Sequence, residues 1–314
     1  MKTLIFGAGP IGRWLALRLQ RAGKDVTLLA RGQAFESLRQ DGIVLIDGFT
    51  GEKKDARPKL VDKLGPEDQY DLIVVAMRTS SRLAVCPILA ANQNLQNVLF
   101  LGNDVSGFHR YHDHLPLGVI LLGFPGAGGG WDGDDLVFVD GDKPGRESGS
   151  LYIGELDGKT RERTSLIKEL FEGAGIAVSV ERHIDGWLKY HFAFMAPTAG
   201  ALLMCGGDVH AVAADKEILR KYIRACREAG NVLRAVGYKR RQPPIFNLYY
   251  WLPEWLGIRV FRGFFSSRKI EVMMGLHAAE VGGEVLEMAE EFEELKARTG
   301  IETPNLDELL SHVK

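Results

Sequence analysis

Residues Met1–Gly12, with the sequence MKTLIFGAGPIG, decide the fold of the first half of the chain. The short apolar run Leu4–Phe6 leads directly into three glycines with the spacing GxGxxG, and a largely apolar helical segment follows as far as Gly23. A strand, a glycine turn and a helix in this order form the context in which GxGxxG indicates dinucleotide binding. The stretch therefore predicts the first strand and helix of a Rossmann-type domain.

The residues of this glycine turn are predicted to bind a cofactor, each in its own way. Gly7 would form the tight turn, Gly9 would let the backbone approach a pyrophosphate, and Gly12 would let the helix pack on its strand. Pro10 and Ile11 lie between them at the start of the helix, whose unpaired N–H groups would face the phosphates. The alternative is an ordinary glycine-rich turn.

The residue that would select the cofactor follows the second predicted strand, residues 25–30. In a protein that binds NAD, an acidic residue near the end of this strand holds the ribose 2′-hydroxyl. Residues 27–32 contain no Asp or Glu but do contain Arg31. A guanidinium offers parallel donors to a 2′-phosphate, so the sequence predicts NADP. An exposed loop arginine is the alternative interpretation.

Two later strands place further residues where ligands bind. The apolar run 71–76 is typical of a buried parallel strand, and Met77 and Arg78 follow it. Asn103 comes shortly after a strand at 97–101. Open α/β sheets bind ligands at the carboxyl ends of their strands, so these residues are candidate cofactor contacts.

The composition of the chain changes after about residue 182. Before that point strands alternate with helices, and after it nearly every segment has helical periodicity. We therefore expect an α/β protein with a Rossmann-type NADP-binding domain at residues 1–182 and an all-α substrate and catalytic domain at residues 183–314.

The net charge, the cysteine content and the lengths of the apolar runs exclude several classes of partner. The 314 residues carry a formal charge of −2 and three cysteines without a CxxC motif. These features predict neither nucleic acid binding nor a disulfide framework. The N-terminus shows no leader pattern and no apolar run is long enough to span a membrane, so we expect a cytoplasmic protein with no membrane partner. The histidine-rich segment 109–114 is interpreted as a solvated loop, and no metal is expected.

Lys189 is the first candidate for chemistry. It is the only Asp, Glu, Lys or Arg residue between Gly186 and Gly207, in a segment that is apolar on nearly all faces. Asp185 is a plausible N-cap for the helix that this segment predicts. A lysine in such a setting must reach water, pair with an acid or face a cavity. We interpret Lys189 as a residue that faces a cleft, and a lysine that extends to water is the alternative.

Glu284 is the second candidate. The last long predicted helix, from about Lys269 to Arg298, has an apolar stripe at helical spacing. Glu284 lies at the edge of that stripe, directly after Gly282 and Gly283. Paired glycines in a helix suggest close packing or a bend. Glu284 is therefore a candidate inward-facing carboxylate, although a solvated glutamate is the ordinary case.

These marks together resemble the ketopantoate reductase family over nearly the whole chain. The matching features are the glycine turn, Arg31, Asn103, Tyr152–Glu155, Trp187-x-Lys189 and Gly300-Ile-x-x-Pro304. The resemblance implies a Rossmann domain followed by a helical domain, with the active site in the cleft between them. It also implies hydride transfer from NADPH to a 2-keto acid.

The resemblance assigns roles to individual residues. Lys189 matches the family's catalytic lysine, and Glu284 matches its conserved acid. Asn103 matches the asparagine beside the nicotinamide, Arg31 the NADP-selecting arginine, and Arg78 a lysine that contacts cofactor phosphate.

Four positions depart from the family pattern. Ala193 and Pro197 stand where the family has asparagines, Val272 stands where it has a substrate-binding serine, and Leu276 stands where it has an aspartate. A site that lacks the donors that a substrate requires discriminates strongly against that substrate. We therefore expect these residues to line an altered, less polar substrate site.

The segment Pro243–Phe265 is rich in aromatic residues and longer than is typical of the family. Three interpretations are open: it lines an apolar substrate pocket, it forms a subunit contact in a homodimer, or it belongs to the hydrophobic core.

The function predicted from these residues is NADPH-dependent reduction of a 2-keto acid or related carbonyl, with a substrate that differs from ketopantoate. Two alternatives are a non-catalytic NADP-binding sensor or interaction protein, and 2-dehydropantoate 2-reductase itself.

Overall fold

The computed structural model describes residues 1–140 and 150–313, although it does not describe the side chains of Ser80, Lys269 and residues 272–284. The chain divides into two compact units. Unit 1 comprises residues 1–102 and 107–184, and unit 2 comprises residues 103–106 and 185–314. The short segment 103–106, which follows a strand of unit 1, thus packs with the helices of unit 2.

The described elements are as follows. Unit 1 contains β1 (Thr3–Phe6), α1 (Pro10–Arg21), β2 (Val26–Leu29), α2 (Gly32–Asp41), β3 (Ile43–Asp47), β4 (Lys53–Ala56), β5 (Lys59–Val61), β6 (Leu72–Val75), α3 (Thr79–Ala90), β7 (Val98–Leu101), α4 (His109–His112), η1 (Leu117–Val119), β8 (Ile120–Pro125), β9 (Gly128–Asp132), β10 (Asp135–Val139), β11 (Ser150–Glu155), α5 (Glu162–Glu172) and β12 (Ala177–Val180). The helices that follow are α6 (Ile184–Met204), α7 (Val209–Ala214), α8 (Lys216–Ala235), η2 (Pro244–Asn247), α9 (Leu248–Trp251), α10 (Glu254–Phe265), α11 (Arg268–Ala297) and α12 (Pro304–Leu310).

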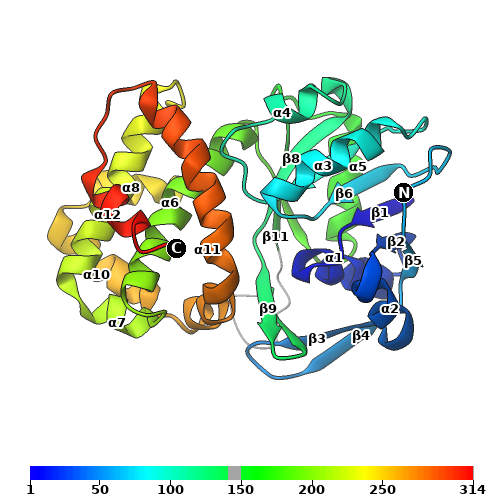
Figure 1. Ribbon diagram of the computed structural model, residues 1–314, viewed down its shortest axis with the longest axis horizontal. Coiled ribbons are helices and arrows are strands. Elements are labelled where there is room, and N and C mark those ends of the chain that lie inside the picture. Colours follow the sequence, from blue (N-terminus) through cyan, green and yellow to red (C-terminus); the bar gives the residue numbers. More distant parts are fainter. Residues whose placement is uncertain (141–149, 314) are drawn as a thin grey trace. The chain divides into compact units, whose positions relative to one another are not determined.

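An eight-stranded sheet organises unit 1, with the strand order β12-β11-β8-β7-β6-β1-β2-β5 (Figure 1). Its pairs are parallel except for the antiparallel pair β11 and β8. All four residues of β1, β2, β6 and β7 are buried, as expected for strands covered on both faces. The predicted α/β class, with a Rossmann-type sheet followed by a helical region, is confirmed.

The predicted strand, turn and helix at the N-terminus are confirmed. β1 ends at Phe6, and α1 begins with Pro10 in its first turn, where a proline costs no helical hydrogen bond. The helix ends before Gly23, whose φ of +70° lies in the left-handed region. β1 pairs in register with both β2 and β6, so the residues after these three strands lie at one edge of the sheet.

A second, four-stranded sheet has the order β4-β3-β10-β9. Its strand β9 contains Gly128–Gly130. Three consecutive glycines are typical of a flexible loop or of a loop that admits a ligand, but here they pair antiparallel with β10. A Cβ atom on Gly129 would lie 2.3 Å from the Phe138 ring, so close packing explains the glycine.

The strands β10 and β11 both have the alternating side chains of antiparallel strands, but they belong to different sheets. β10 pairs with β9 and β3, whereas β11 pairs with β8 and β12. Alternation of side chains identifies a strand, but it does not identify its partner.

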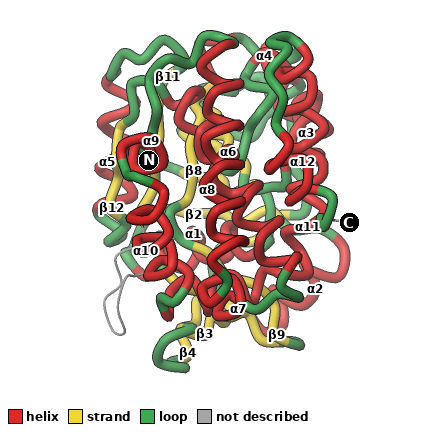
Figure 2. Tube along the Cα trace, turned by 90° about the vertical axis from the view of Figure 1, so that its left-hand side faces the viewer, coloured by secondary structure: helices red, strands yellow, loops and turns green. Residues whose placement is uncertain are grey.

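The helices of unit 2 enclose their own hydrophobic core. α8 packs against α7, α10 and α12 (Figure 2), and Asp215 caps its N-terminus through two backbone N–H groups. Much of the core is aromatic: the Tyr222 ring makes edge contacts with Tyr249, Phe261 and Phe265. The core interpretation of the aromatic segment 243–265 therefore holds for part of it. None of the described helices has the length and low charge content that a membrane span requires.

Gly12 provides a test of the fold. A Cβ atom there would lie 1.9 Å from the carbonyl oxygen of Gly7, so Gly12→Ala must displace the turn from α1. We expect a loss of about 1–3 kcal/mol in the free energy of unfolding, measured by chemical denaturation. The matched control is Gly9→Ala, because a Cβ on Gly9 would meet nothing within 4 Å. Equal stability of the two variants would contradict the close packing.

Candidate active site

The glycine turn has the backbone geometry that a dinucleotide site requires. Gly7 has a φ of +117°, and a Cβ on it would lie 2.6 Å from the carbonyl oxygen of Ala76. Gly9 is the N-cap of α1, has extended backbone, and leaves open space where a Cβ would be. A ligand phosphate can therefore reach the backbone at Gly9 and the N-terminal N–H groups of α1, where Pro10, Ile11 and Gly12 lie.

Arg31 lies beside this turn. It is the exposed N-cap of α2, directly after β2, and its guanidinium is 5.6 Å from the centre of the Phe6 ring. Because β2 neighbours β1 in the sheet, Arg31 lies at the same strand edge as the glycine turn. A long cation at this position is free to reach an anionic group bound there.

Met77 and Arg78 follow β6 at this edge, and Arg78 is the exposed N-cap of α3. A residue that the sequence did not indicate, Arg82, supports them. Arg82 is buried, and its Nε donates to the Met77 carbonyl at 2.9 Å. Gly102, with a φ of +125°, makes room for the guanidinium, since a Cβ there would lie 2.0 Å from Nη2. Arg82 thus braces the ends of β6 and β7.

In unit 2, Lys189 is held by an ion pair within its own helix. Lys189 is 1% exposed, and its Nζ donates to Asp185 Oδ1 at 2.6 Å. The second carboxylate oxygen of Asp185 accepts from the Tyr238 hydroxyl at 2.8 Å. The Nζ atom also lies 5.0 Å from the centre of the Tyr238 ring. The expectation that Asp185 is an N-cap is wrong: α6 begins at Ile184, so Asp185 lies in its first turn, four residues before Lys189.

This arrangement keeps the lysine charged. Burial alone would lower the pKa of Lys189, but the Asp185 carboxylate, with smaller effects from Tyr238 and Asp104, raises that pKa above its ordinary value. Burial raises the pKa of Tyr238 to about 12, so its hydroxyl remains a hydrogen-bond donor. At neutral pH the Lys189 side chain is therefore a charged ammonium group. The carboxylate of Asp185 neutralises its charge and fixes the position of Nζ.

Asn103 forms a hydrogen bond with α6, the helix that carries Lys189. His191 Nδ1 lies 3.0 Å from Asn103 Oδ1, and the imidazole stacks on the Trp187 ring with centroids 5.2 Å apart. Burial lowers the pKa of His191 to about 3, so the ring is neutral. Because an amide oxygen only accepts, the ring hydrogen lies on Nδ1 and is donated to Asn103. The sequence signal for this contact is the position of His191, two residues after Lys189 in the same apolar segment.

A second contact anchors the segment 103–106. The backbone N–H of Ser106 donates to Glu291 Oε2 at 3.1 Å, and Glu291 is a buried residue of α11. α6 and α11 therefore both hold the segment that carries Asn103.

The structure describes only some of the other residues that the sequence predicted for the site. Ala193 and Pro197 are buried in α6, and Ala193 belongs to the hydrophobic core of unit 2. The side chains of Glu284 and Val272 lie outside the described residues, so their roles remain predictions. The interpretation of segment 109–114 as a loop is wrong in part, because His109–His112 form α4, although His109 and residues 112–114 are exposed. The described residues contain no group of three potential metal ligands.

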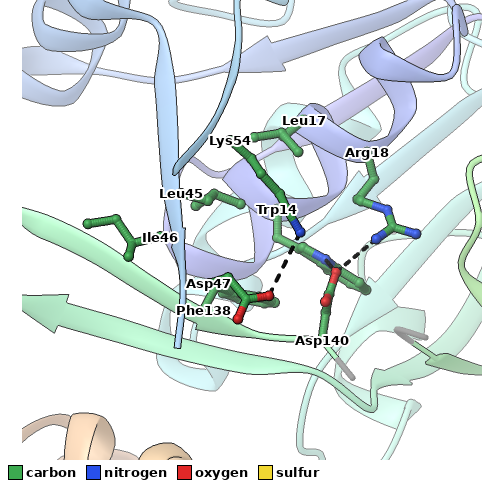
Figure 3. Close-up of a pocket in the computed structure, with 9 residues that line it drawn as sticks. All are labelled: Trp14, Leu17, Arg18, Leu45, Ile46, Asp47, Lys54, Phe138 and Asp140. Carbon is green, nitrogen blue, oxygen red and sulfur yellow. Dashed lines mark hydrogen bonds and ion pairs between the residues drawn. The ribbon is translucent and has the colours of Figure 1, made fainter. Parts of the chain in front are cut away.

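A pocket of unit 1 lies between α1 and the four-stranded sheet (Figure 3). Its charges are mutually satisfied: Arg18 and the Trp14 indole both donate to Asp140 at 2.9 Å, and Lys54 lies 3.8 Å from Asp47. This cluster fastens the second sheet to α1.

Comparison with known proteins identifies relatives. The model of the family "Ketopantoate reductase PanE/ApbA" matches residues 3–158. The uncharacterized oxidoreductase YkpB of Bacillus subtilis is 28% identical over 211 residues, which cover 64% of each chain. The 2-dehydropantoate 2-reductase of Mesorhizobium japonicum is 29% identical over 210 residues, which cover 60% of this chain and 63% of that one. The chain thus spans less than two thirds of the length of these relatives.

A solved structure extends the likeness to the whole fold. D-mandelate dehydrogenase in a ternary structure with NADH and anilino(oxo)acetate has a TM-score of 0.78. The match covers 100% of this chain and 97% of that one, at 17% sequence identity. At this identity the comparison shows a shared fold.

The ion pair of Lys189 gives a testable pH dependence. In Asp185→Asn, burial would dominate and the pKa of Lys189 would fall below its ordinary value. We expect a loss of about 3 kcal/mol in the free energy of unfolding at pH 7, since one partner of a buried pair is removed. The loss should shrink as the pH rises toward about 10.4, the ordinary lysine pKa, because the variant then buries a neutral amine.

Denaturation curves of wild type and variant between pH 7 and 10 measure this difference. The control is Tyr238→Phe, which removes one hydrogen bond but keeps the charge pair, and should cost only about 1 kcal/mol. A pH-independent effect of Asp185→Asn would show that Lys189 is not the group concerned.

Proposed function

The chain belongs to the ketopantoate reductase family, and from this premise we propose that it reduces a 2-keto acid or a related carbonyl with NADPH. Its class, a ketopantoate-reductase-like oxidoreductase, follows from the family. The observation that carries the finer proposal is the buried ammonium of Lys189, whose charge is kept by Asp185 and Tyr238. A protein that only bound the cofactor would have no evident need for such a group.

Lys189 would act on the carbonyl oxygen. The cofactor, when bound, supplies the hydride that goes to the carbonyl carbon. The ammonium Nζ would first donate a hydrogen bond to the oxygen and then its proton, because an alkoxide is far more basic than an amine. A preformed charge in a site without water stabilises the developing oxyanion most effectively. Asp185 would hold Nζ in position throughout, and Glu284 is proposed as a second carboxylate that orients Lys189.

Asn103 would position the nicotinamide side of the reaction. Its amide oxygen is committed to His191, which sets the orientation of the whole amide group. The amide NH2 group, a donor of two hydrogens, is therefore presented in one fixed direction.

The glycine turn and Arg31 support NADPH as the cofactor. Open space at Gly9 and the N-terminus of α1 fit a pyrophosphate. Met77 and Arg78, at the same strand edge, are proposed to contact the cofactor as well. Arg31 would pair with the 2′-phosphate. The D-mandelate dehydrogenase of similar fold was solved with NADH, so NADH is the competing cofactor in any assay.

The substrate is proposed to be less polar than ketopantoate. Ala193, Pro197 and Val272 supply no hydrogen-bonding side chains where the family has polar ones. The D-mandelate dehydrogenase of similar fold acts, by its name, on an aromatic 2-hydroxy acid. We propose a 2-keto acid with an apolar side chain. Residues 1–182 would bind the cofactor and residues 183–314 the substrate.

Lys189 provides the direct test of the reaction. Lys189→Met keeps the volume of the side chain but removes the donor, and we expect kcat to fall about 10²–10⁴-fold. The assay follows NADPH oxidation with a panel of 2-keto acids that includes ketopantoate and aryl 2-keto acids. NADPH affinity serves as the control for folding and should stay within a few-fold of wild type.

Three outcomes discriminate the alternatives. Equal rates for wild type and Lys189→Met would reject the role of Lys189. Tight NADPH binding by wild type with no carbonyl reduced would favour the non-catalytic protein. Ketopantoate as the best substrate would establish 2-dehydropantoate 2-reductase itself.

Arg31 tests the cofactor. Arg31→Ala should lower kcat/KM for NADPH about 10–100-fold, the loss of a charged hydrogen-bond pair, and leave kcat/KM for NADH unchanged. Arg39→Ala is the matched control, because Arg39 is an exposed arginine of the same helix that pairs with Glu36. If wild type prefers NADH, the proposed selection of NADPH is wrong.

A further inference from the structure

The most exposed large apolar side chains of the described residues are concentrated in one short segment. Trp251 is 72% exposed, Trp255 61% and Ile245 58%. Single exposed apolar residues are ordinary, but a group of them marks an interaction surface. The two tryptophans are four residues apart, so their Cα atoms lie within about 14 Å of each other.

The outward face of α10 continues this group. The helix buries Gly257, Ile258, Phe261 and Phe265 in unit 2. Trp255, Arg259 and Arg262, at the spacing i, i+4 and i+7, are exposed, as is Val260. We call Ile245, Trp251, Trp255, Arg259, Val260 and Arg262 the tryptophan surface. An ordinary solvated helix face carries charges of both signs, whereas this one carries only cations among apolar residues.

Sequence and contacts both show how basic this region is. Residues 239–269 contain seven Lys and Arg residues and a single acid, Glu254, in a chain of net charge −2. Glu254 is committed to the helix beneath, since it pairs with Arg220 at 2.7 Å and Arg224 at 3.0 Å of α8. No carboxylate of this segment therefore offsets Arg259 and Arg262.

This combination fits an anionic lipid bilayer. Tryptophan prefers the boundary between lipid and water, where its ring is buried and its N–H group is hydrated. Exposed arginines are attracted to anionic headgroups. A second copy of the chain fits less well, because a two-fold contact would place the same cations against each other. A pocket lining also fits less well, since the two tryptophans are the most exposed aromatic side chains described.

We propose that the tryptophan surface binds the protein peripherally to membranes that contain anionic lipids. The expectation of no membrane partner rested on the lack of a spanning segment, and a surface contact needs none. The apolar side chains would enter the headgroup region, and the arginines would remain among the lipid phosphates.

Vesicle flotation tests the proposal with the full chain. Wild type should float with vesicles of phosphatidylcholine and 30% phosphatidylglycerol in 0.1 M salt, bind much less in 0.5 M salt, and not float with phosphatidylcholine alone. Arg259→Ala should weaken binding about fivefold. Trp251→Ser with Trp255→Ser should weaken it by at least about tenfold, since two large apolar side chains lose their burial.

The controls separate a specific surface from general stickiness. Leu166→Ser removes another exposed apolar residue, 46% exposed on α5 of unit 1, and should change nothing. All variants replace exposed residues and should unfold at the wild-type temperature. The proposal is overturned if the wild-type protein does not float with anionic vesicles. It is equally overturned if the double variant Trp251→Ser, Trp255→Ser binds these vesicles as tightly as wild type does. It is also overturned if wild type is a dimer and the tryptophan variants are monomers by light scattering.

Discussion

A charge buried in an apolar helix constrains the whole second unit. Lys189 cannot remain ionised in its surroundings without a carboxylate, and Asp185 supplies one a single helical turn away. The hydroxyl of Tyr238, 53 residues further along the chain, donates a hydrogen bond to the second carboxylate oxygen of Asp185. The ion pair thereby ties the start of α6 to the chain that follows α8, and it presents a charged donor where the proposed reaction needs one.

The structure of unit 1 depends on a different constraint, which is the lack of a side chain at the glycines of the turn between β1 and α1. At Gly7 and Gly12 the backbone approaches so closely that a Cβ would collide with a carbonyl oxygen, whereas at Gly9 the space is open. Close packing at Gly7 and Gly12 thus fixes the turn between β1 and α1. The open space at Gly9 leaves the backbone of this turn accessible to a ligand. Two residues at the same edge of the sheet, Arg31 and Arg78, are cations, which suits a phosphate-rich cofactor.

Local patterns predicted the fold well because its signals are local. GxGxxG with its strand and helix, and the lone lysine in an apolar helix, are readable within twenty residues. The partner of Lys189 was not predicted, although Asp185 precedes it by four residues, because helix boundaries are the least certain part of such a prediction. Its contact with Tyr238, and the contact between Asn103 and His191, join distant segments that no periodicity connects. Gly128–Gly130 form a strand although three consecutive glycines are typical of a loop, because the packing of Phe138 leaves no room for a Cβ atom on Gly129.

Asp185 and Tyr238 keep Lys189 protonated in spite of its burial. A ¹⁵N NMR titration of lysine-labelled protein, with the Lys189 signal assigned by Lys189→Met, measures this directly. We expect an ammonium signal that persists at pH 10 and titrates above the ordinary lysine pKa. A Lys189 signal that titrates near neutral pH would show instead that burial outweighs the ion pair with Asp185.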